Sequence, residues 1–157
     1  MNSDSSDDSV SLDMCIELLH FSFRNIISEP DKMLKQRGLN RSHHRILHFI
    51  GRSEGMRLNR LLRILGVSRQ ALHRPLKQLA EQGLVEMTQM AQDRRNYRLR
   101  LTAEGRRLEQ RLSGPQKDMF AQARSELGED ALKNWAAVMK VLSRGTPWDD
   151  LPELLKE

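Results

Sequence analysis

Apolar residues recur at helical spacing from Leu12 onward. The first run alternates spacings of four and three residues and comprises Leu12, Ile16, Leu19, Phe23 and Ile26. This pattern predicts one long amphipathic helix, and its seam suits packing against another helix as well as against the protein's own core. Because Pro30 disfavours helical geometry in the residue before it, we expect this helix to end near Ser28. A short helix should then run from Pro30 to Gly38.

Capping residues predict where the next helices begin. Asn40 precedes a helix over Arg41–Arg52, and a shorter helix follows over 58–65. Ser68 precedes another, which runs from Arg69 to about Gln82.

The pattern then changes from helical spacing to alternation. The stretches "LVEMT" and "YRLRL", at 84–88 and 97–101, predict two strands of a hairpin. Its turn should lie around Gln92–Asn96. After the hairpin, Thr102 is a good helix cap.

Two further helical regions follow the cap. The tripeptide "SGP" at 113–115 predicts a break, with segments of about 103–112 and 115–127. A final amphipathic helix should cover about 131–142. The tail is expected to form one short turn of helix at most.

The region 58–82 has the plan of a helix-turn-helix. A short helix ends at Gly66, the turn "GVS" follows, and the second helix carries apolar residues on one side only. The opposite face and its cap carry side chains that can reach base edges and phosphates in a DNA major groove. They are Ser68, Arg69, Gln70, His73, Arg74 and Lys77. Within this set we expect Ser68 to contact phosphate.

A hairpin directly after such a helix indicates a winged helix. The wing tip can lie against the minor groove, whose negative potential attracts arginine. We expect Arg94 and Arg95 to act there, with Asp93 accepting a hydrogen bond that holds the Arg95 guanidinium extended.

The placement of charge supports a polyanion as partner. The whole chain has a formal net charge of +5. Residues 57–107 hold twelve cations and four acidic residues, so the remainder is net acidic. A basic middle between acidic ends is typical of a polyanion-binding module carried by a second structural unit.

Composition excludes several other classes of protein. The polar, acidic start "MNSDSSDDSV" is no secretory signal, and no apolar run is long enough to cross a membrane. A single cysteine fits a reducing cytoplasm. No nucleophile–base pair, phosphate loop or cofactor motif is present, so we expect neither an enzyme nor a bound cofactor.

The stretches "LGVSRQALHRPLKQLAEQGLVE" and "DRRNYRLRLTAEG" resemble the MarR (multiple antibiotic resistance regulator) family of bacterial winged-helix transcription factors. The D-x-R wing motif is present as Asp93 and Arg95, and an L-T-x-x-G motif as Leu101, Thr102 and Gly105. The resemblance covers about 40–108. It implies a homodimer that binds a pseudo-palindromic operator in double-stranded DNA, and repression that a small molecule or an oxidant relieves.

The fold implied is mainly α with a small β-hairpin wing, a winged helix-turn-helix joined to a helical dimerisation unit. Five segments are expected: a disordered acidic leader (1–9), N-terminal dimerisation helices (10–39), the DNA-binding domain (40–108), C-terminal dimerisation helices (109–145) and an acidic tail (146–157). Pro75 departs from an ordinary recognition helix. We expect it on the core side, where it should kink the helix against the body of the domain.

A cavity for a small aromatic or anionic effector is expected between the two units. Its predicted lining is His43, Leu47, Leu19 and Phe23. Within that lining, His43 is either a satisfied core histidine or a group that binds the effector.

Cys15 is a candidate for an oxidant sensor, and the histidines of the chain are candidates for a metal site. Cys15 is expected to be an inert, largely buried thiol. His43, His44 and His48, with His20 or Cys15, do not make a convincing metal site, so none is predicted. The alternatives that stay open are a winged helix that binds an acidic protein and a metal- or redox-sensing form of the same regulator.

Overall fold

The computed structural model describes residues 10–91 and 93–156, apart from the side chains of Arg94, Arg95 and residues 154–156. The expected leader and Gln92 lie outside these residues. The elements in order are α1 (Leu12–Gln36), α2 (Arg41–Arg52), β1 (Met56–Arg57), α3 (Leu58–Leu65), α4 (Arg69–Glu81), β2 (Val85–Met90), β3 (Asp93–Leu101), α5 (Ala103–Leu127), α6 (Glu129–Leu142) and α7 (Leu151–Lys156). The expected fold class, mainly α with a small β wing, is confirmed.

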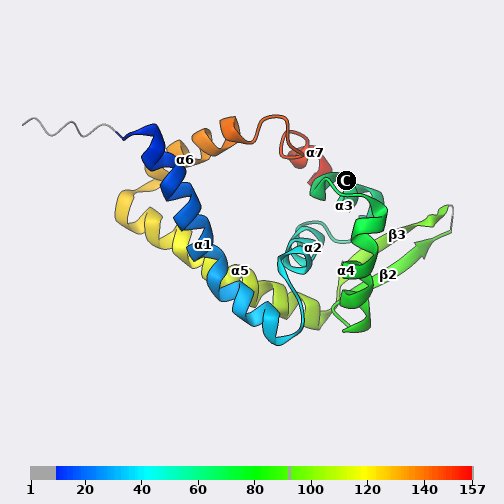
Figure 1. Ribbon diagram of the computed structural model, residues 1–157. Helices are drawn as coiled ribbons and strands as arrows, with labels where there is room; N and C mark the ends of the chain where they lie inside the picture. The colour runs from blue at the N-terminus through cyan, green and yellow to red at the C-terminus, as the bar shows by residue number, and fades with distance from the viewer. Residues whose placement is uncertain (1–9, 92, 157) are drawn as a thin grey trace, which may run out of the picture.

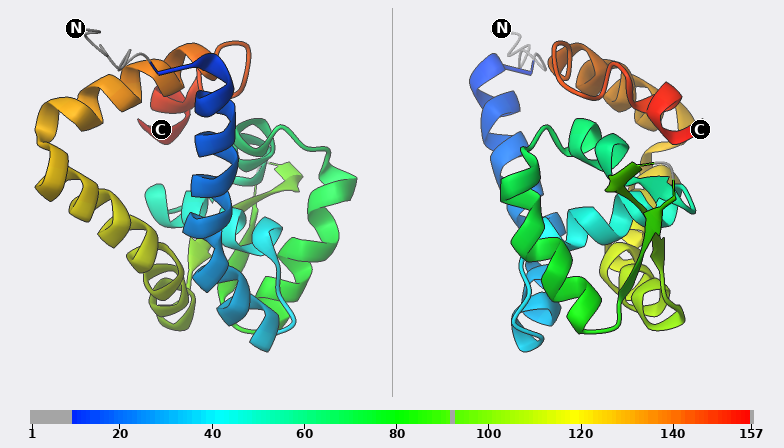
Figure 2. Two further views of the ribbon diagram at one scale, coloured as in Figure 1. Left: turned by 60° about the vertical axis from the view of Figure 1, so that its left-hand side comes forward. Right: turned by 90° about the vertical axis from the view of Figure 1, so that its right-hand side faces the viewer.

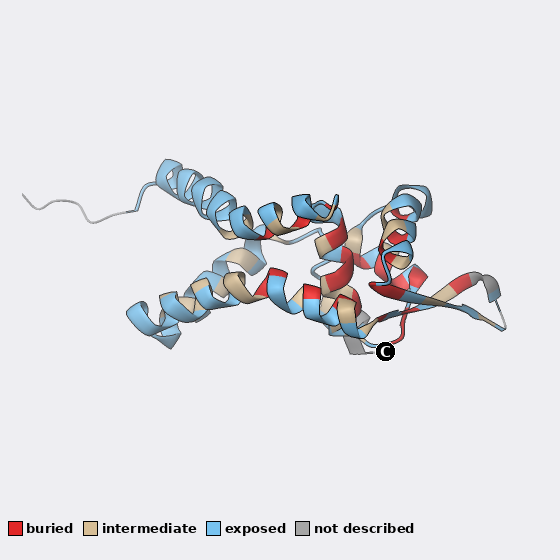
Figure 3. Cartoon of the chain, turned by 90° about the horizontal axis from the view of Figure 1, so that it is seen from below, coloured by how far each residue is buried: buried red, intermediate tan, exposed pale blue. Residues whose placement is uncertain are grey.

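The molecule has two sides. Helices α3 and α4 and the sheet lie on one side, and α5 and α6 extend away on the other (Figures 1 and 2). Buried residues gather around the sheet and the helices that cover it, whereas the outer parts of α1 and α6 are exposed (Figure 3). The core therefore supports the winged helix more than the extended helices.

The sheet is antiparallel, with the order β1-β3-β2. The two-residue strand β1 was not expected, because two residues are too few to show alternation. The hairpin turn is tighter than expected. Met90 already pairs with Asp93, and a shift in register leaves residues 94–96 as a bulge in β3.

Helix α1 continues through Pro30, so the expected break near Ser28 is wrong. Proline lacks the N–H that would bond the carbonyl of Ile26. The side-chain amide of Gln116 on α5 donates to that carbonyl at 3.5 Å. Pro30 itself is fully buried, and packing against α5 holds the helix together across the proline.

Helix α5 is also one helix, so the expected break at 113–115 is wrong. It packs against both α1 and α2, and Leu112 and Ser113, just before Pro115, are buried. These tertiary contacts on both sides outweigh the local cost of the proline.

The C-terminal segment returns to the helix-turn-helix. Leu151 packs on the core, and Asp150 lies 3.9 Å from Arg63 on α3. The six residues of α7 form slightly more helix than the single turn expected. Within the described residues, no helix is long and apolar enough to span a membrane.

Candidate nucleic-acid interface

Helix α4 is positioned by the turn that precedes it. Gly66 ends α3 in the left-handed conformation, with φ of 63°. The hydroxyl of Ser68 then accepts a hydrogen bond from the N–H of Ala71 at 3.2 Å and caps α4. These local signals give the expected helix-turn-helix, and α4 ends within one residue of the predicted boundary.

The two faces of α4 separate as the sequence predicts. Leu72, Leu76 and Leu79 are buried on the inner face. The expected DNA-contacting residues are all exposed and come together on the outer face: Arg69, Gln70, His73, Arg74 and Lys77. The helix continues through half-buried Pro75, which borders a small hollow beside Ser42 of α2. The proline thus lies on the body side, as expected.

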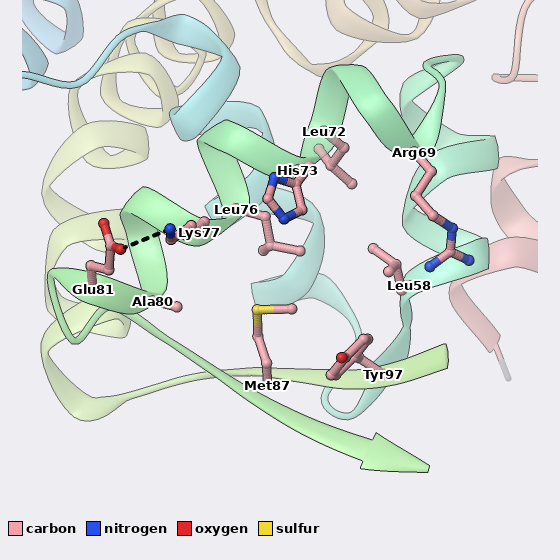
Figure 4. Close-up of a pocket in the computed structure, with 10 residues that line it drawn as sticks. All are labelled: Leu58, Arg69, Leu72, His73, Leu76, Lys77, Ala80, Glu81, Met87 and Tyr97. Atoms are coloured by element: carbon pink, nitrogen blue, oxygen red, sulfur yellow. Dashed lines mark ion pairs between the residues drawn. The ribbon is translucent and has the colours of Figure 1, made fainter. Parts of the chain in front are cut away.

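Three side chains of the predicted DNA-contacting set, the exposed cap residue Ser68 among them, already have partners within the chain. The Ser68 hydroxyl is occupied by its cap, and Arg69 donates to the Asn59 side chain at 2.5 Å. Nζ of Lys77 lies 3.6 Å from the carboxylate of Glu81 (Figure 4). Both members of this pair are well exposed, so the ion pair is weak.

The wing carries its arginines in two groups. Tyr97, Leu99 and Leu101 face the core, as the alternation predicts, whereas Arg98 and Arg100 are exposed. Both of these arginines lie over the loop before β1, with Arg98 donating to the carbonyl of Gly55 at 3.4 Å.

The second group of arginines lies in the bulge near the wing tip. Arg94 and Arg95 follow exposed Asp93 there. Their side chains lie outside the described residues, so the Asp93–Arg95 hydrogen bond stays a prediction.

A groove of about 600 Å³ separates α4 from the wing (Figure 4). Leu72 and Leu76 of α4 and Met87 and Tyr97 of the sheet give it an apolar lining, and Arg69, His73 and Lys77 also border it. The sequence does not predict this groove, because it depends on the angle between α4 and the hairpin.

Two of the four residues in the predicted effector lining, His43 and Leu47, are buried. Leu47 is fully buried. His43 is a satisfied core histidine: its Nδ1 accepts from the N–H of Asn40 at 3.1 Å, and its Nε2 lies 3.1 Å from the side-chain oxygen of Gln78. Burial lowers the pKa of His43, although both hydrogen bonds act in the opposite direction. Both residues lie on the buried inner face of α2.

Two neighbouring hollows lie where the effector cavity was expected. The first, of about 450 Å³, is formed by α1, α2 and α5 and is named here the α2–α5 hollow. Its lining is Phe23, Ile27, Arg41, His44, Arg45, His48, Phe49 and Gln116. The second, of about 430 Å³, is apolar and lies among α1, α5 and α6, where Leu19 and Phe23 border it. The arginines and histidines of the first hollow lie on the face of α2 next to the face that carries His43 and Leu47.

Cys15 is exposed, so the expectation of a largely buried thiol is wrong for this chain. Its apolar neighbours on α1 are exposed too, because no other part of the described chain covers that face. Among the residues that the structure places, no three His, Cys, Asp or Glu side chains converge as metal ligands would.

Comparison with known proteins agrees with this geometry. The sequence profile of the MarR family matches residues 37–96, from the end of α1 into the wing. The HTH-type transcriptional regulator PetP of Rhodobacter capsulatus is 35% identical over 127 residues, which is 81% of this chain and 76% of PetP.

Solved structures share the fold at lower identity. A MarR family transcription regulator, SP03579, superposes with a TM-score of 0.70 at 20% identity and covers 90% of this chain and 93% of its own. The Staphylococcus aureus MepR–DNA complex gives 0.65 at 19% identity, with 86% and 98% covered. NadR in complex with 4-hydroxyphenylacetate gives 0.66 at 19% identity, with 92% and 99% covered.

Proposed function

This chain belongs to the MarR family and is a DNA-binding transcriptional regulator, and we propose that it acts in the cytoplasm as a homodimeric repressor that a small effector releases. The observation that carries the proposal is the exposed cationic face of α4 beside a basic wing. Such a pair of elements matches the major and minor grooves of one duplex.

Each element has its own part in DNA binding. The outer face of α4 reads the major groove through Arg69, Gln70, His73, Arg74 and Lys77, and Ser68 contacts phosphate. Arg95 enters the minor groove, oriented by Asp93 and with Arg94 beside it. The MepR–DNA complex supports this part of the proposal, since a protein of this fold binds DNA.

The exposed apolar residues support a homodimer. Leu12, Ile16 and Leu19 are 83%, 68% and 47% exposed along α1. On α6, Trp135, Val138 and Leu142 are exposed as well. This many exposed apolar residues on two helices are costly in water and are typical of an interface. A second copy of the same helices would cover it and place two winged helices on one operator.

The α2–α5 hollow is the site we propose for the effector. Two phenylalanines give it an aromatic lining, two arginines give it positive charge, and two histidines add polar ring nitrogens. This combination suits a small aromatic anion. NadR, which shares the fold, is known in complex with 4-hydroxyphenylacetate.

Binding to a duplex that contains the operator, measured over a salt series, tests the DNA-binding part. Replacing Arg95 with alanine should weaken binding and flatten the slope of log affinity against log salt by about one if it neutralises one phosphate. Arg124→Ala, an exposed arginine on α5 outside the proposed interface, is the matched control and should change neither quantity. Unchanged binding by the Arg95 variant would reject the role of the wing. Binding of an acidic protein that duplex DNA does not displace would favour a protein-docking winged helix.

A further inference from the structure

A series of polar contacts links α2 to α5 beside the α2–α5 hollow. Ser113 is buried, and its hydroxyl donates to Oε1 of Glu109 at 2.6 Å. Nε2 of His44 lies 3.2 Å from the Ser113 oxygen, and Nδ1 of His48 lies 3.2 Å from the same Glu109 oxygen. His44 and His48 are four residues apart on α2, so they face the same part of α5.

These contacts define which nitrogen of His44 carries its hydrogen. The Ser113 hydroxyl has one hydrogen and donates it to Glu109. Nε2 of His44 must therefore donate to the Ser113 oxygen. In the neutral ring Nδ1 is then without a hydrogen, so a second proton binds to His44 at Nδ1.

Charged and titratable groups face His44 from α1, α2 and α5. In chain order these are Asp31, Arg41, Arg45, His48 and Glu109. Burial lowers the pKa of His44 and the neighbouring His48 lowers it further, while Glu109 and Asp31 act in the opposite direction without restoring the usual value. The ring is therefore mostly neutral at neutral pH.

Arg41 and Arg45 would only partly balance the negative charge of an anion bound in the hollow. Arg41 already forms an ion pair with Asp31 at 2.9 Å, so much of its charge is neutralised within the chain. Arg45 is exposed and shares its charge with solvent. An anion in the hollow would thus favour the charged form of the half-buried His44 beside it.

We infer that the α2–α5 hollow binds its anionic effector together with one proton, which His44 takes up at Nδ1. The inference rests on the effector site proposed above and adds that the site responds to pH. The proton-bound form of His44 binds the anion more tightly. Affinity is therefore highest below the pKa of the free protein, and it falls as the pH rises toward the higher pKa of the complex.

Isothermal titration calorimetry of the full-length protein tests this inference. Benzoate serves as the probe, because it is a small aromatic carboxylate. At pH 7 the binding heat should differ between phosphate and Tris buffers by an amount that corresponds to uptake of up to one proton per chain. The dissociation constant should rise by up to about tenfold per pH unit between the two pKa values.

Two variants separate His44 from the other histidines. His44→Gln keeps an amide that can donate to Ser113 but cannot titrate, so its binding heat should not depend on the buffer. His20→Gln, at an exposed position on α1 outside the hollow, should behave like the original protein. A second readout uses the unchanged protein, so it does not depend on whether a variant folds. In NMR spectra followed over pH, the ring signals of the five histidines should show one pKa that rises when benzoate is added.

The outcomes are distinct from those of the DNA-binding experiment. Buffer-independent heat in the unchanged protein, proton uptake that survives His44→Gln, or absence of benzoate binding at millimolar concentration would each overturn the inference. None of these results would contradict the proposal that α4 and the wing bind DNA, because the salt series measures DNA binding without any effector.

Discussion

Gly105, in the first turn of α5, lies so close to the carbonyl oxygen of Leu84 that a Cβ atom on Gly105 would overlap it. The same carbonyl accepts a hydrogen bond from the N–H of Thr102 at 3.1 Å. The hydroxyl of Thr102 accepts from the N–H of Gly105 at 3.0 Å and donates to the carbonyl of Gly83 at 2.6 Å. The L-T-x-x-G motif thus joins the start of α5 to the turn at Gly83 and Leu84, directly before β2.

Replacing Gly105 with alanine should destabilise the protein. The methyl group meets backbone, which cannot rotate away, so we expect a loss of about 2 kcal/mol or more in the free energy of unfolding. Gly114→Ala, in the same helix with nothing within 4 Å of its Cβ position, should be neutral or slightly stabilising. Urea unfolding followed by circular dichroism measures both, and equal effects would contradict the account of Gly105.

Replacing Glu81 with glutamine should strengthen DNA binding. The change releases Lys77 from its ion pair and removes a negative charge beside the proposed major-groove face. We expect affinity for duplex DNA to rise by a few-fold at low salt, and the gain to shrink as salt screens it. Fluorescence anisotropy with a labelled duplex measures the effect. Asp130→Asn removes a similarly exposed ion pair with Lys133 on α6 and should leave affinity unchanged.

Ile16→Glu should convert the proposed homodimer into monomers. The side chain is 68% exposed on the apolar face of α1, and a buried glutamate without a partner there would cost several kcal/mol. Light scattering after size-exclusion chromatography gives the mass directly. Val67→Glu makes the same kind of change at an exposed position outside α1 and α6 and should remain dimeric. If the original chain already has the mass of one copy, the dimer is rejected.

Stability should fall as the pH drops below about 6.5, the ordinary histidine value. His43 and His44 both have a lowered pKa in the folded protein. The unfolded chain therefore binds more protons than the folded chain between the lowered values and the ordinary one. Stability is full above that window and is lost as the pH falls through it, with at most about 1.4 kcal/mol per pH unit for each histidine. Urea midpoints from pH 8 to pH 5 measure this, and His43→Gln should reduce the slope.

Helix starts were predictable because the interactions that define them are local. Asn40, Ser68 and Thr102 each cap the helix expected from the sequence. The inner and outer faces of α4 were also predictable from local information. Helical spacing alone places Leu72 on the inner face and Arg74 on the outer face.

The features that sequence reasoning missed depend on contacts between distant elements. Pro30 was expected to end a helix, but Gln116 on α5, far along the chain, donates to the carbonyl that the proline leaves unbonded. The hollow proposed for the effector lies one helical face away from the predicted lining, because it forms where α1 and α5 lie against α2. His44 and His48 border it, while His43 is held in the core by Asn40 and Gln78.

The unbroken course of α5 has a mechanical consequence. Its 25 residues make a rod about 37 Å long at 1.5 Å per residue, fixed at one end to the hairpin and reaching the exposed helices at the other. A tilt of about 5° would swing the far end by about 3 Å, close to the 3.4 Å step between base pairs. In the homodimer proposed above, a tilt of that size, set off where α5 borders the α2–α5 hollow, would move the two α4 helices out of phase with the turns of the DNA double helix.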